Sequence, residues 1–178
     1  MKPHLSRYTL RAFVLFLLIA GMTACQIDEP APENEITNDG ELAPDFSLTS
    51  LDGNTVTLKD YEDKVVVLFF FGYSCPNCIR SAPGIESNIT EVFASNPNFA
   101  IIGLDQWNGN QAGVASFKEK TGVTFPLLMQ ASGTAADYST TYDRLLVVDR
   151  DGYIAFRANA SAGSSVSTVV DTVNDLLK

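Results

Sequence analysis

The sequence predicts an α/β domain with a mostly parallel β-sheet. Two apolar runs, Val65 to Phe71 (VVVLFFF) and Phe99 to Leu104 (FAIIGL), are too short for membrane helices and are typical of buried strands. Each run precedes a segment with a helical pattern. Strands that alternate with helices favour a parallel sheet. We expect this folded domain to span residues 42–178.

The other elements follow from local patterns. A turn at Asp52-Gly53 predicts an early hairpin, and the apolar spacing after residue 75 predicts a helix that Pro83 should kink. In the expected order of elements along the chain, the helices at the two ends should cover the two faces of one sheet. The expected elements are strands at 45–50, 55–58, 65–71, 99–104 and 125–129; a helix with apolar positions Ile85, Ile89, Val92 and Phe93; a helix at 111–120 ended by Gly122; a helical turn at 135–138; a hairpin of 145–148 and 153–156; and a helix over 166–177.

Two cysteines, Cys75 and Cys78, follow the strand predicted at 65–71. Residues 72–74 are expected to form a turn, so that Cys75 begins the next helix and Cys78 lies about one turn further along. The unpaired N–H groups and the positive potential of a helix N-terminus stabilise a thiolate. We therefore expect Cys75 to be the nucleophile of the pair.

Three kinds of site could use this CPNC pair. A zinc site needs about four ligands, but the chain has one histidine, His4, and no second CxxC. A structural disulfide between Cys75 and Cys78 would close a very small loop and so remove little entropy from the unfolded chain. A redox-active dithiol at a strand-to-helix turn is the interpretation that we adopt. We expect no metal and no organic cofactor.

The N-terminus resembles the signal of a bacterial lipoprotein. Basic residues precede an apolar run of about ten residues, Ala12 to Gly21, which is too short to span a membrane. Small residues and then Cys25 follow, where such signals are cleaved and the cysteine is lipidated. We expect residues 1–24 to be removed and Cys25 to carry lipid; an ordinary cleaved signal is the alternative. Lipidation of Cys25 would leave Cys75 and Cys78 as a natural pair.

Residues 25–41 are expected to form a flexible acidic tether between a membrane and the domain. From Gln26 to Glu41 the chain has six acidic residues, two prolines and no basic residue. Such a segment cannot bury enough apolar area to offset the entropy of ordering it; an ordered extension on the domain is the alternative. The net charge of −9 argues against nucleic acid as a partner.

Two stretches, APDFSLTSLDGNTVTLKDY and KVVVLFFFGYSCPNCIRSAP, resemble the opening half of the thioredoxin-like superfamily. The resemblance is closest to exported thiol–disulfide oxidoreductases of the TlpA/ResA type and to the broader redoxin and peroxiredoxin group. GVTFPLL and LLVVDRDGYI resemble later strands of the family, so the likeness covers residues 42–178. It implies a three-layer fold with a central mixed sheet and helices on both faces. It also implies that Cys75 attacks a client disulfide and that Cys78 resolves the mixed disulfide.

Several positions depart from the family pattern. The family usually has Trp directly before the first cysteine, where this chain has Ser74. When the family strand that follows the cis-proline is aligned on LLVVD, the cis-proline position opposite the dithiol falls at Asp143 or its neighbours. No proline follows Pro126, so this chain lacks that proline. Phe69 and Ser81 occupy the two positions where related enzymes carry a buried acid that moves protons. These departures concern substrate handling and proton transfer rather than the fold.

Two other residues could act near the dithiol. Trp107 follows a predicted strand end and could line a groove for a partner, or it could be a partly buried aromatic residue of a loop. Arg80 could add positive potential near Cys75. Since most arginine side chains stay exposed, a solvated helix residue is the simpler interpretation of Arg80.

The sequence thus predicts a membrane-anchored thiol–disulfide oxidoreductase of the bacterial cell envelope, on the periplasmic or extracytoplasmic side. Its expected partners are exported protein thiols and disulfides and a membrane electron donor or acceptor; the direction of electron flow stays open. One alternative is a non-catalytic binding protein with a static disulfide. The other is a thiol peroxidase, although the peroxidase motif P-x-x-x-T/S-x-x-C is not matched, since Leu68 and Phe71 lie seven residues before the two cysteines.

Overall fold

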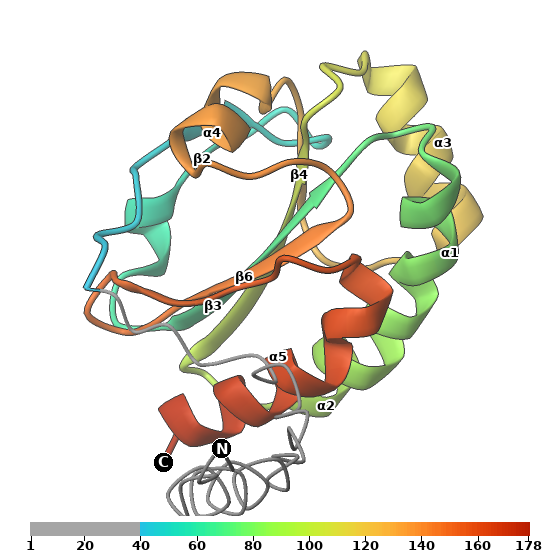
Figure 1. The fold of residues 1–178 in the computed structure, drawn as a ribbon. Helices are drawn as coiled ribbons and strands as arrows, with labels where there is room; N and C mark the ends of the chain where they lie inside the picture. The colour runs from blue at the N-terminus through green and yellow to red at the C-terminus, as the bar shows by residue number, and fades with distance from the viewer. Residues whose placement is uncertain (1–39) are drawn as a thin grey trace, which may run out of the picture. The chain divides into compact units, whose positions relative to one another are not determined.

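A computed structural model describes residues 40–178 of the chain (Figure 1). The predicted signal at 1–24, the lipidated Cys25 and nearly all of the tether at 25–41 lie outside the described residues. Within the part that the structure describes, no helix is both long enough and apolar enough to cross a membrane.

A five-stranded mixed sheet forms the centre of the domain, in the order β5-β4-β3-β6-β7. The central strands β3 (Val65–Phe71) and β4 (Phe99–Asp105) run parallel, and the two-residue β5 (Leu127–Leu128) continues that direction. The hairpin of β6 (Arg144–Val148) and β7 (Ile154–Arg157) joins β3 antiparallel. The mixed sheet that the resemblance implies is confirmed. The sequence prediction of a mostly parallel sheet holds only for β3, β4 and β5. The other half of the sheet, β6 and β7, is antiparallel.

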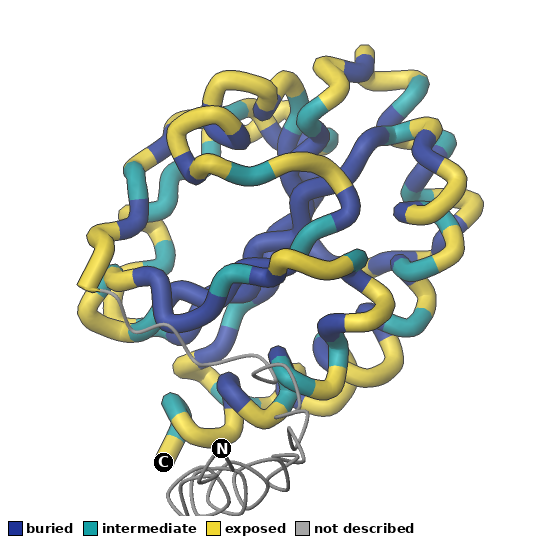
Figure 2. Tube along the Cα trace, viewed as in Figure 1, coloured by how far each residue is buried: buried dark blue, intermediate teal, exposed yellow. Residues whose placement is uncertain are grey.

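The central strand β3 is buried on both faces because all seven of its side chains are apolar. Figure 2 shows the central strands as the buried interior, with exposed residues on the surrounding loops and helices. Successive side chains of a strand point to opposite faces, so β3 contributes to two separate clusters. One cluster takes Val65, Val67, Phe69 and Phe71, and the other takes Val66, Leu68 and Phe70.

Three helices cover the first face: α1 (Pro76–Ile85), α3 (Gln111–Thr121) and α5 (Ala162–Leu176). Figure 1 shows α1 and α5 on the same side of the sheet. The expectation that the first and last helices would cover opposite faces is therefore wrong. The hairpin of β6 and β7 returns the chain to the face already occupied by α1, so α5 packs beside α1.

The second face has a thinner cover. It consists of the hairpin of β1 (Ser47–Thr49) and β2 (Thr55–Thr57), the 3-10 helix η1 (Leu58–Tyr61) and the short helix α4 (Ser132–Asp137). Tyr138, at the end of α4, is fully buried and packs against Phe70 of β3 with ring centroids 5.6 Å apart. The predicted early hairpin and the helices on both faces are thus confirmed.

The helix after the cysteines changes its winding. Pro83 lies inside α1 and has no N–H to donate to the preceding turn. The chain continues as a π-helix, η2 (Glu86–Thr90), and then as α2 (Glu91–Phe93). The wider π turn rotates the residues that follow it. Ile85, Ile89 and Phe93 are buried as predicted, whereas Val92 is 57% exposed and does not belong to the apolar face.

Candidate active site

The two cysteines of the CPNC motif lie at the N-terminus of α1. Cys75 is the N-cap residue, with an extended backbone (φ −67°, ψ 119°), and Pro76 is the first helical residue. Proline suits this position because its missing N–H would have no helical partner there. The Sγ of Cys75 accepts a hydrogen bond of 3.2 Å from the backbone N–H of Cys78. The predicted placement of both cysteines at the helix start agrees with the structure.

Both thiols are buried and are not bonded to each other in this structure. Burial raises the pKa of Cys78, and its hydrogen bond with Cys75 and the charges of Cys75 and Asp143 raise it further, while a hydrogen bond with the Gly72 backbone lowers it. Cys78 is therefore a neutral thiol near pH 7. It must lose its proton before it can attack another sulfur atom.

A buried carboxylate, Asp105, holds the turn that precedes Cys75. Its Oδ1 accepts from the backbone N–H of Tyr73 at 3.0 Å and of Trp107 at 3.3 Å, and its Oδ2 accepts from Gly109 at 2.5 Å. Burial raises the pKa of Asp105, and these three hydrogen bonds lower it. The carboxylate thus fastens the strand-to-helix turn to the loop after β4. Our sequence reasoning missed Asp105, although its position at the end of a buried parallel strand is a signal for a functional or organising group.

Three aromatic residues lie beside this turn. The ring of Trp107 covers Gly72 so closely that a Cβ at Gly72 would come within 2.5 Å of it. Tyr73 and Tyr142 each meet Trp107 edge to face, with ring centroids 6.5 Å and 5.0 Å away. Trp107 and Tyr142 keep about 40% of their surface exposed (41% and 40%). Trp107 therefore lies next to the turn that carries Cys75, and its partial exposure fits both a residue of a partner groove and a partly buried aromatic residue of a loop.

Asp143 occupies the loop that faces the dithiol, and the cis-proline position of the family pattern is expected at Asp143 or its neighbours. The described residues contain no cis peptide bond, and Asp143 instead adopts a left-handed backbone with φ 56°. Its side chain is buried and accepts a long hydrogen bond of 3.5 Å from the hydroxyl of Ser81. Burial raises the pKa of Asp143; Ala162 N–H, Arg144, Ser81 and Arg80 lower it. Two positions that depart from the family pattern, Ser81 and Asp143, are therefore in contact.

The other predicted residues have simpler surroundings. Phe69 is fully buried and packs against Phe71, with ring centroids 5.7 Å apart, so it supplies only apolar contact. Arg80 is exposed and donates a hydrogen bond of 3.0 Å to the side chain of Asn77. Within residues 40–178, no group of three or more His, Cys, Asp and Glu side chains is arranged to hold a metal ion.

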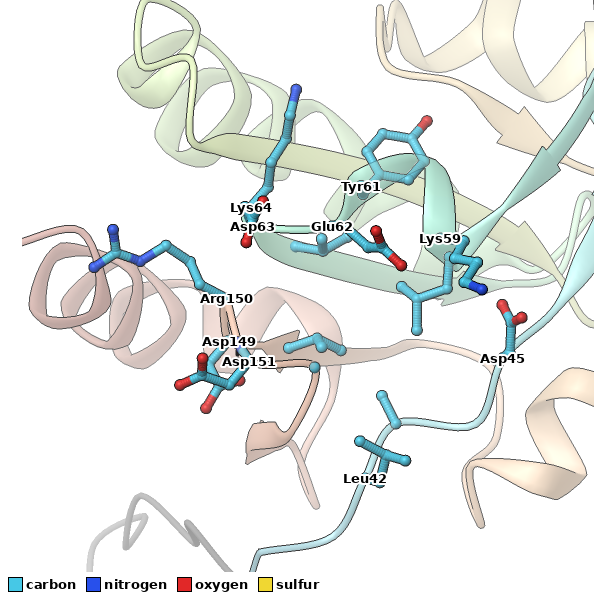
Figure 3. A pocket seen from close by; sticks show the side chains of 15 residues that line it. Leu42, Asp45, Lys59, Tyr61, Glu62, Asp63, Lys64, Asp149, Arg150 and Asp151 are labelled. Atoms are coloured by element: carbon cyan, nitrogen blue, oxygen red, sulfur yellow. Dashed lines mark hydrogen bonds between the residues drawn. The ribbon is translucent and has the colours of Figure 1, made fainter.

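A cleft of about 430 Å³ lies at the opposite end of β3 from the cysteines (Figure 3). Its wall includes Leu42, Val66 and Val148, together with η1 and the turn at 149–152. Figure 3 shows acidic and basic side chains around it, among them Lys59, Glu62 and Asp149. Since Cys75 and Cys78 follow the C-terminal end of β3, this cleft is separate from the dithiol.

Comparison with known proteins gives matches over the described domain. The model of the AhpC/TSA family matches residues 40–157. The thiol-disulfide oxidoreductase ResA of Oceanobacillus iheyensis is 27% identical over 140 residues, which are 76% of this chain and 71% of ResA. A Mycobacterium tuberculosis protein provisionally named a peroxiredoxin, Rv2521, is 31% identical over 130 residues, which are 65% of this chain and 80% of that protein.

A solved structure supports the same assignment. The solution structure of a Bacteroides thetaiotaomicron protein, provisionally described as a protein disulfide isomerase, matches with a TM-score of 0.69 and 32% identity. The match covers 78% of this chain and 89% of that protein. The family model spans well over half of the chain. The chain therefore belongs to the AhpC/TSA family and has a thioredoxin-like fold.

Proposed function

We propose that this protein is a thiol–disulfide oxidoreductase that exchanges disulfides with protein clients through Cys75 and Cys78. The observation that carries the proposal is the hydrogen bond from the Cys78 N–H to the Cys75 Sγ at the start of α1. It directs a backbone donor and the positive end of a helix toward one sulfur atom, an arrangement typical of the attacking cysteine of such a pair. The relative named thiol-disulfide oxidoreductase supports this assignment.

The two cysteines would act in sequence. The thiolate of Cys75 attacks a client disulfide, one client sulfur leaves as a thiolate, and a mixed disulfide forms. Cys78 then loses its proton and attacks the Sγ of Cys75. The Cys75–Cys78 disulfide forms, the second client sulfur leaves, and the client has gained two electrons. The same steps in reverse oxidise a client, so the partner that recycles the pair sets the direction.

Single substitutions test this sequence of steps. The full-length protein in detergent, with dithiothreitol as reductant, is expected to reduce a model protein disulfide such as that of insulin. Cys75→Ser should lose this activity, because the nucleophile is gone. Reduced Cys78→Ser, freed of dithiothreitol before it meets the oxidised client, should trap a covalent adduct with the client on Cys75. Mass spectrometry of acid-quenched samples detects the adduct. An active Cys75→Ser protein would exclude Cys75 as the attacking residue.

We also propose that the protein is anchored to a membrane of the cell envelope through a lipid on Cys25, with residues 25–41 as the tether. The signal-like residues 1–24 and the acidic composition of the tether support this. Labelling with a fatty-acid analogue and fractionation of cells should place the wild type in the membrane fraction. A Cys25→Ala protein should carry no label. If wild type and variant are equally unlabelled, the lipid anchor does not exist.

A thiol peroxidase is a second candidate, favoured by the peroxiredoxin relative and by the family model. That chemistry requires a polar loop that positions a peroxide next to the reactive cysteine. Here, Leu68 and Phe71 occupy the corresponding positions and are fully buried in β3. We therefore expect the wild type to consume hydrogen peroxide no faster than Cys75→Ser in an assay with dithiothreitol. Rapid consumption that depends on Cys75 would make the peroxidase the better assignment.

A further inference from the structure

The exchange cycle has a requirement that the CPNC motif does not meet by itself. Cys78 is fully buried, and burial together with nearby negative charge keeps its thiol protonated at neutral pH. Resolution of a mixed disulfide therefore needs a group that accepts this proton. Phe69 has no titratable group, and the hydroxyl of Ser81 is too weakly acidic to exist as an anion that could take the proton.

Asp143 supplies a carboxyl group from a different element of the fold. It lies in the loop before β6 and is only 4% exposed. Its Oδ1 accepts from Ser81 at 3.5 Å, and Ser81 lies three residues after Cys78 on the same face of α1. The charge of Asp143 also acts directly on the Cys78 thiol. The carboxyl is thus held above the first turns of α1, where Cys78 lies.

The structure fixes the backbone that carries this carboxyl from several sides. The carbonyl of Asp143 accepts from the N–H of Ala162 at 2.9 Å and from the guanidinium of Arg144 at 2.8 Å. On the other side of the contact, Ser81 lies against the start of α5, where a Cβ on Gly163 would meet its Oγ at 3.0 Å. Asp143 keeps a left-handed backbone (φ 56°) that few side chains adopt and that Asp tolerates better than most. Strain of this kind persists where surrounding contacts define one orientation.

The groups around Asp143 have opposing effects on its ionisation. Burial disfavours its anion, while the N–H of Ala162, Arg144 of its own loop, Ser81 and Arg80 of α1 favour it. Because burial is the largest of these effects, the pKa of Asp143 is raised above that of an ordinary aspartate. A carboxyl with a raised pKa takes and returns a proton more readily near neutral pH.

We propose that Asp143 is the proton acceptor for Cys78 when this cysteine resolves the mixed disulfide. The inference rests on the proposed function. In the step, the S–H bond of Cys78 breaks and its proton passes to the Asp143 carboxylate. The sulfur electron pair forms the bond to the Sγ of Cys75, the bond between Cys75 and the client breaks, and the client leaves as a thiolate. Asp143 then gives its proton to that thiolate or to water, and the reverse step serves client oxidation.

The resolution step can be measured by itself. Reduced full-length protein is mixed with oxidised glutathione and quenched with acid, and mass spectrometry separates reduced protein, glutathione adduct and closed disulfide. Asp143→Asn keeps the size of the side chain and its tolerance of the left-handed backbone but cannot accept the proton. We expect the adduct to accumulate and its closure to slow about 100-fold at pH 7, with the gap narrowing as hydroxide replaces the carboxylate at higher pH. Asp137→Asn, an exposed acid of α4, is the matched control and should close at the wild-type rate.

Failure of this inference and failure of the proposed function give different results. If the wild type forms no adduct and no closed disulfide, the exchange function itself is wrong. If the wild type closes and Asp143→Asn closes at the same rate with the same pH profile, Asp143 is not the acceptor.

Ser81→Ala gives a second test should Asp143→Asn lose its cooperative thermal transition. Because Ser81 lowers the pKa of Asp143, its removal should move the pH midpoint of closure upward. A midpoint that does not move would overturn the proposal.

Discussion

At the scale of single residues, two buried carboxyl groups organise the region around the dithiol, and they act differently. Asp105 accepts from three backbone N–H groups and holds the loops together. Asp143 accepts one long hydrogen bond from the side chain of Ser81, interacts with the N–H of Ala162, and carries a left-handed backbone. An acid with three donors is suited to fix a conformation, whereas an acid with few donors remains free to exchange a proton. We therefore assign stability to Asp105 and proton transfer to Asp143.

Asp105→Ala should destabilise the domain and loosen the turn before Cys75. The substitution leaves the N–H groups of Tyr73, Trp107 and Gly109 without their acceptor, and one unsatisfied buried donor costs about 1–3 kcal/mol. We expect a loss of about 3 kcal/mol in the free energy of unfolding, measured by urea denaturation. The fluorescence of Trp107, the single tryptophan of the chain, should change in the folded state. Unchanged stability would mean that the loops are held by other contacts.

The raised pKa of Asp143 gives a pH dependence of stability with a definite sign. In the folded state this carboxyl binds its proton more tightly than in the unfolded state, because burial is the largest effect on it. The native state therefore loses stability as the pH rises from the ordinary aspartate range through the raised pKa. Asp143→Asn cannot titrate, so its stability relative to the wild type should increase over that pH range. Urea denaturation at several pH values measures this, and a difference in the opposite direction would show that the anion is the favoured form.

At the scale of elements, the turn between β3 and α1 places the cysteines, and the π-helix after Pro83 sets which residues face the core. A regular helix would bury residues at spacings of three and four along its whole length. The π turn of η2 moves Val92 out to solvent while Ile89 remains fully buried. The same turn buries Glu86, whose carboxylate accepts from the backbone and the hydroxyl of Thr124 at 3.1 Å and 2.5 Å. The irregular winding thus links the active-site helix to the segment before β5.

Two alanine substitutions on this helix distinguish the observed winding from a regular one. Ile89→Ala should cost about 2–5 kcal/mol of stability, because it leaves a cavity in a fully packed region. Val92→Ala should change stability by less than about 0.5 kcal/mol, because this side chain is exposed. Thermal and urea unfolding of both variants measure the two values. A cost of 1 kcal/mol or more for Val92→Ala would indicate a regular helix with Val92 on its apolar face.

At the scale of the whole molecule, the chain is acidic, with a net charge of −9. Charge of one sign attracts oppositely charged partners and slows encounters with like-charged ones, and salt weakens both effects. At low ionic strength, we expect a basic peptide disulfide to be reduced about tenfold faster than an acidic peptide of the same length. The ratio should approach one near 0.5 M salt, and a neutral peptide serves as the control. Equal rates at low salt would show that the net charge of the chain has no effect on how fast charged clients meet the dithiol.

The sequence predicted those parts of the molecule that depend on local pattern. The run of seven apolar residues at Val65–Phe71 forms a strand with these bounds, and Gly122 ends α3 with the left-handed backbone that glycine allows. The predicted strand at 125–129 shortens to Leu127–Leu128, because only these residues pair with β4. The spacing of apolar residues could not show that a π turn would place Val92 on the exposed face of the helix rather than against the core.

The contacts of the candidate site depend on tertiary structure and were less predictable. Cys75 and Cys78 could be placed at a helix start because the motif is local. The contact between Ser81 and Asp143 joins positions 62 residues apart, and no local pattern encodes it. The hydrogen bonds of Asp105 likewise form only when the loop after β4 folds back over Tyr73. The family pattern marked Ser81 and Asp143 as departures, but only the fold shows that the two departures meet.

The reduction potential of the Cys75–Cys78 pair tests the central claim most directly. The full-length protein in detergent is equilibrated in graded ratios of reduced and oxidised dithiothreitol or glutathione, and its free thiols are counted by alkylation and mass. We predict reversible closure of the pair at a potential between about −300 and −120 mV, the range of working dithiols in related folds. A pair that stays closed far below this range, or that never closes, would contradict a role in disulfide exchange.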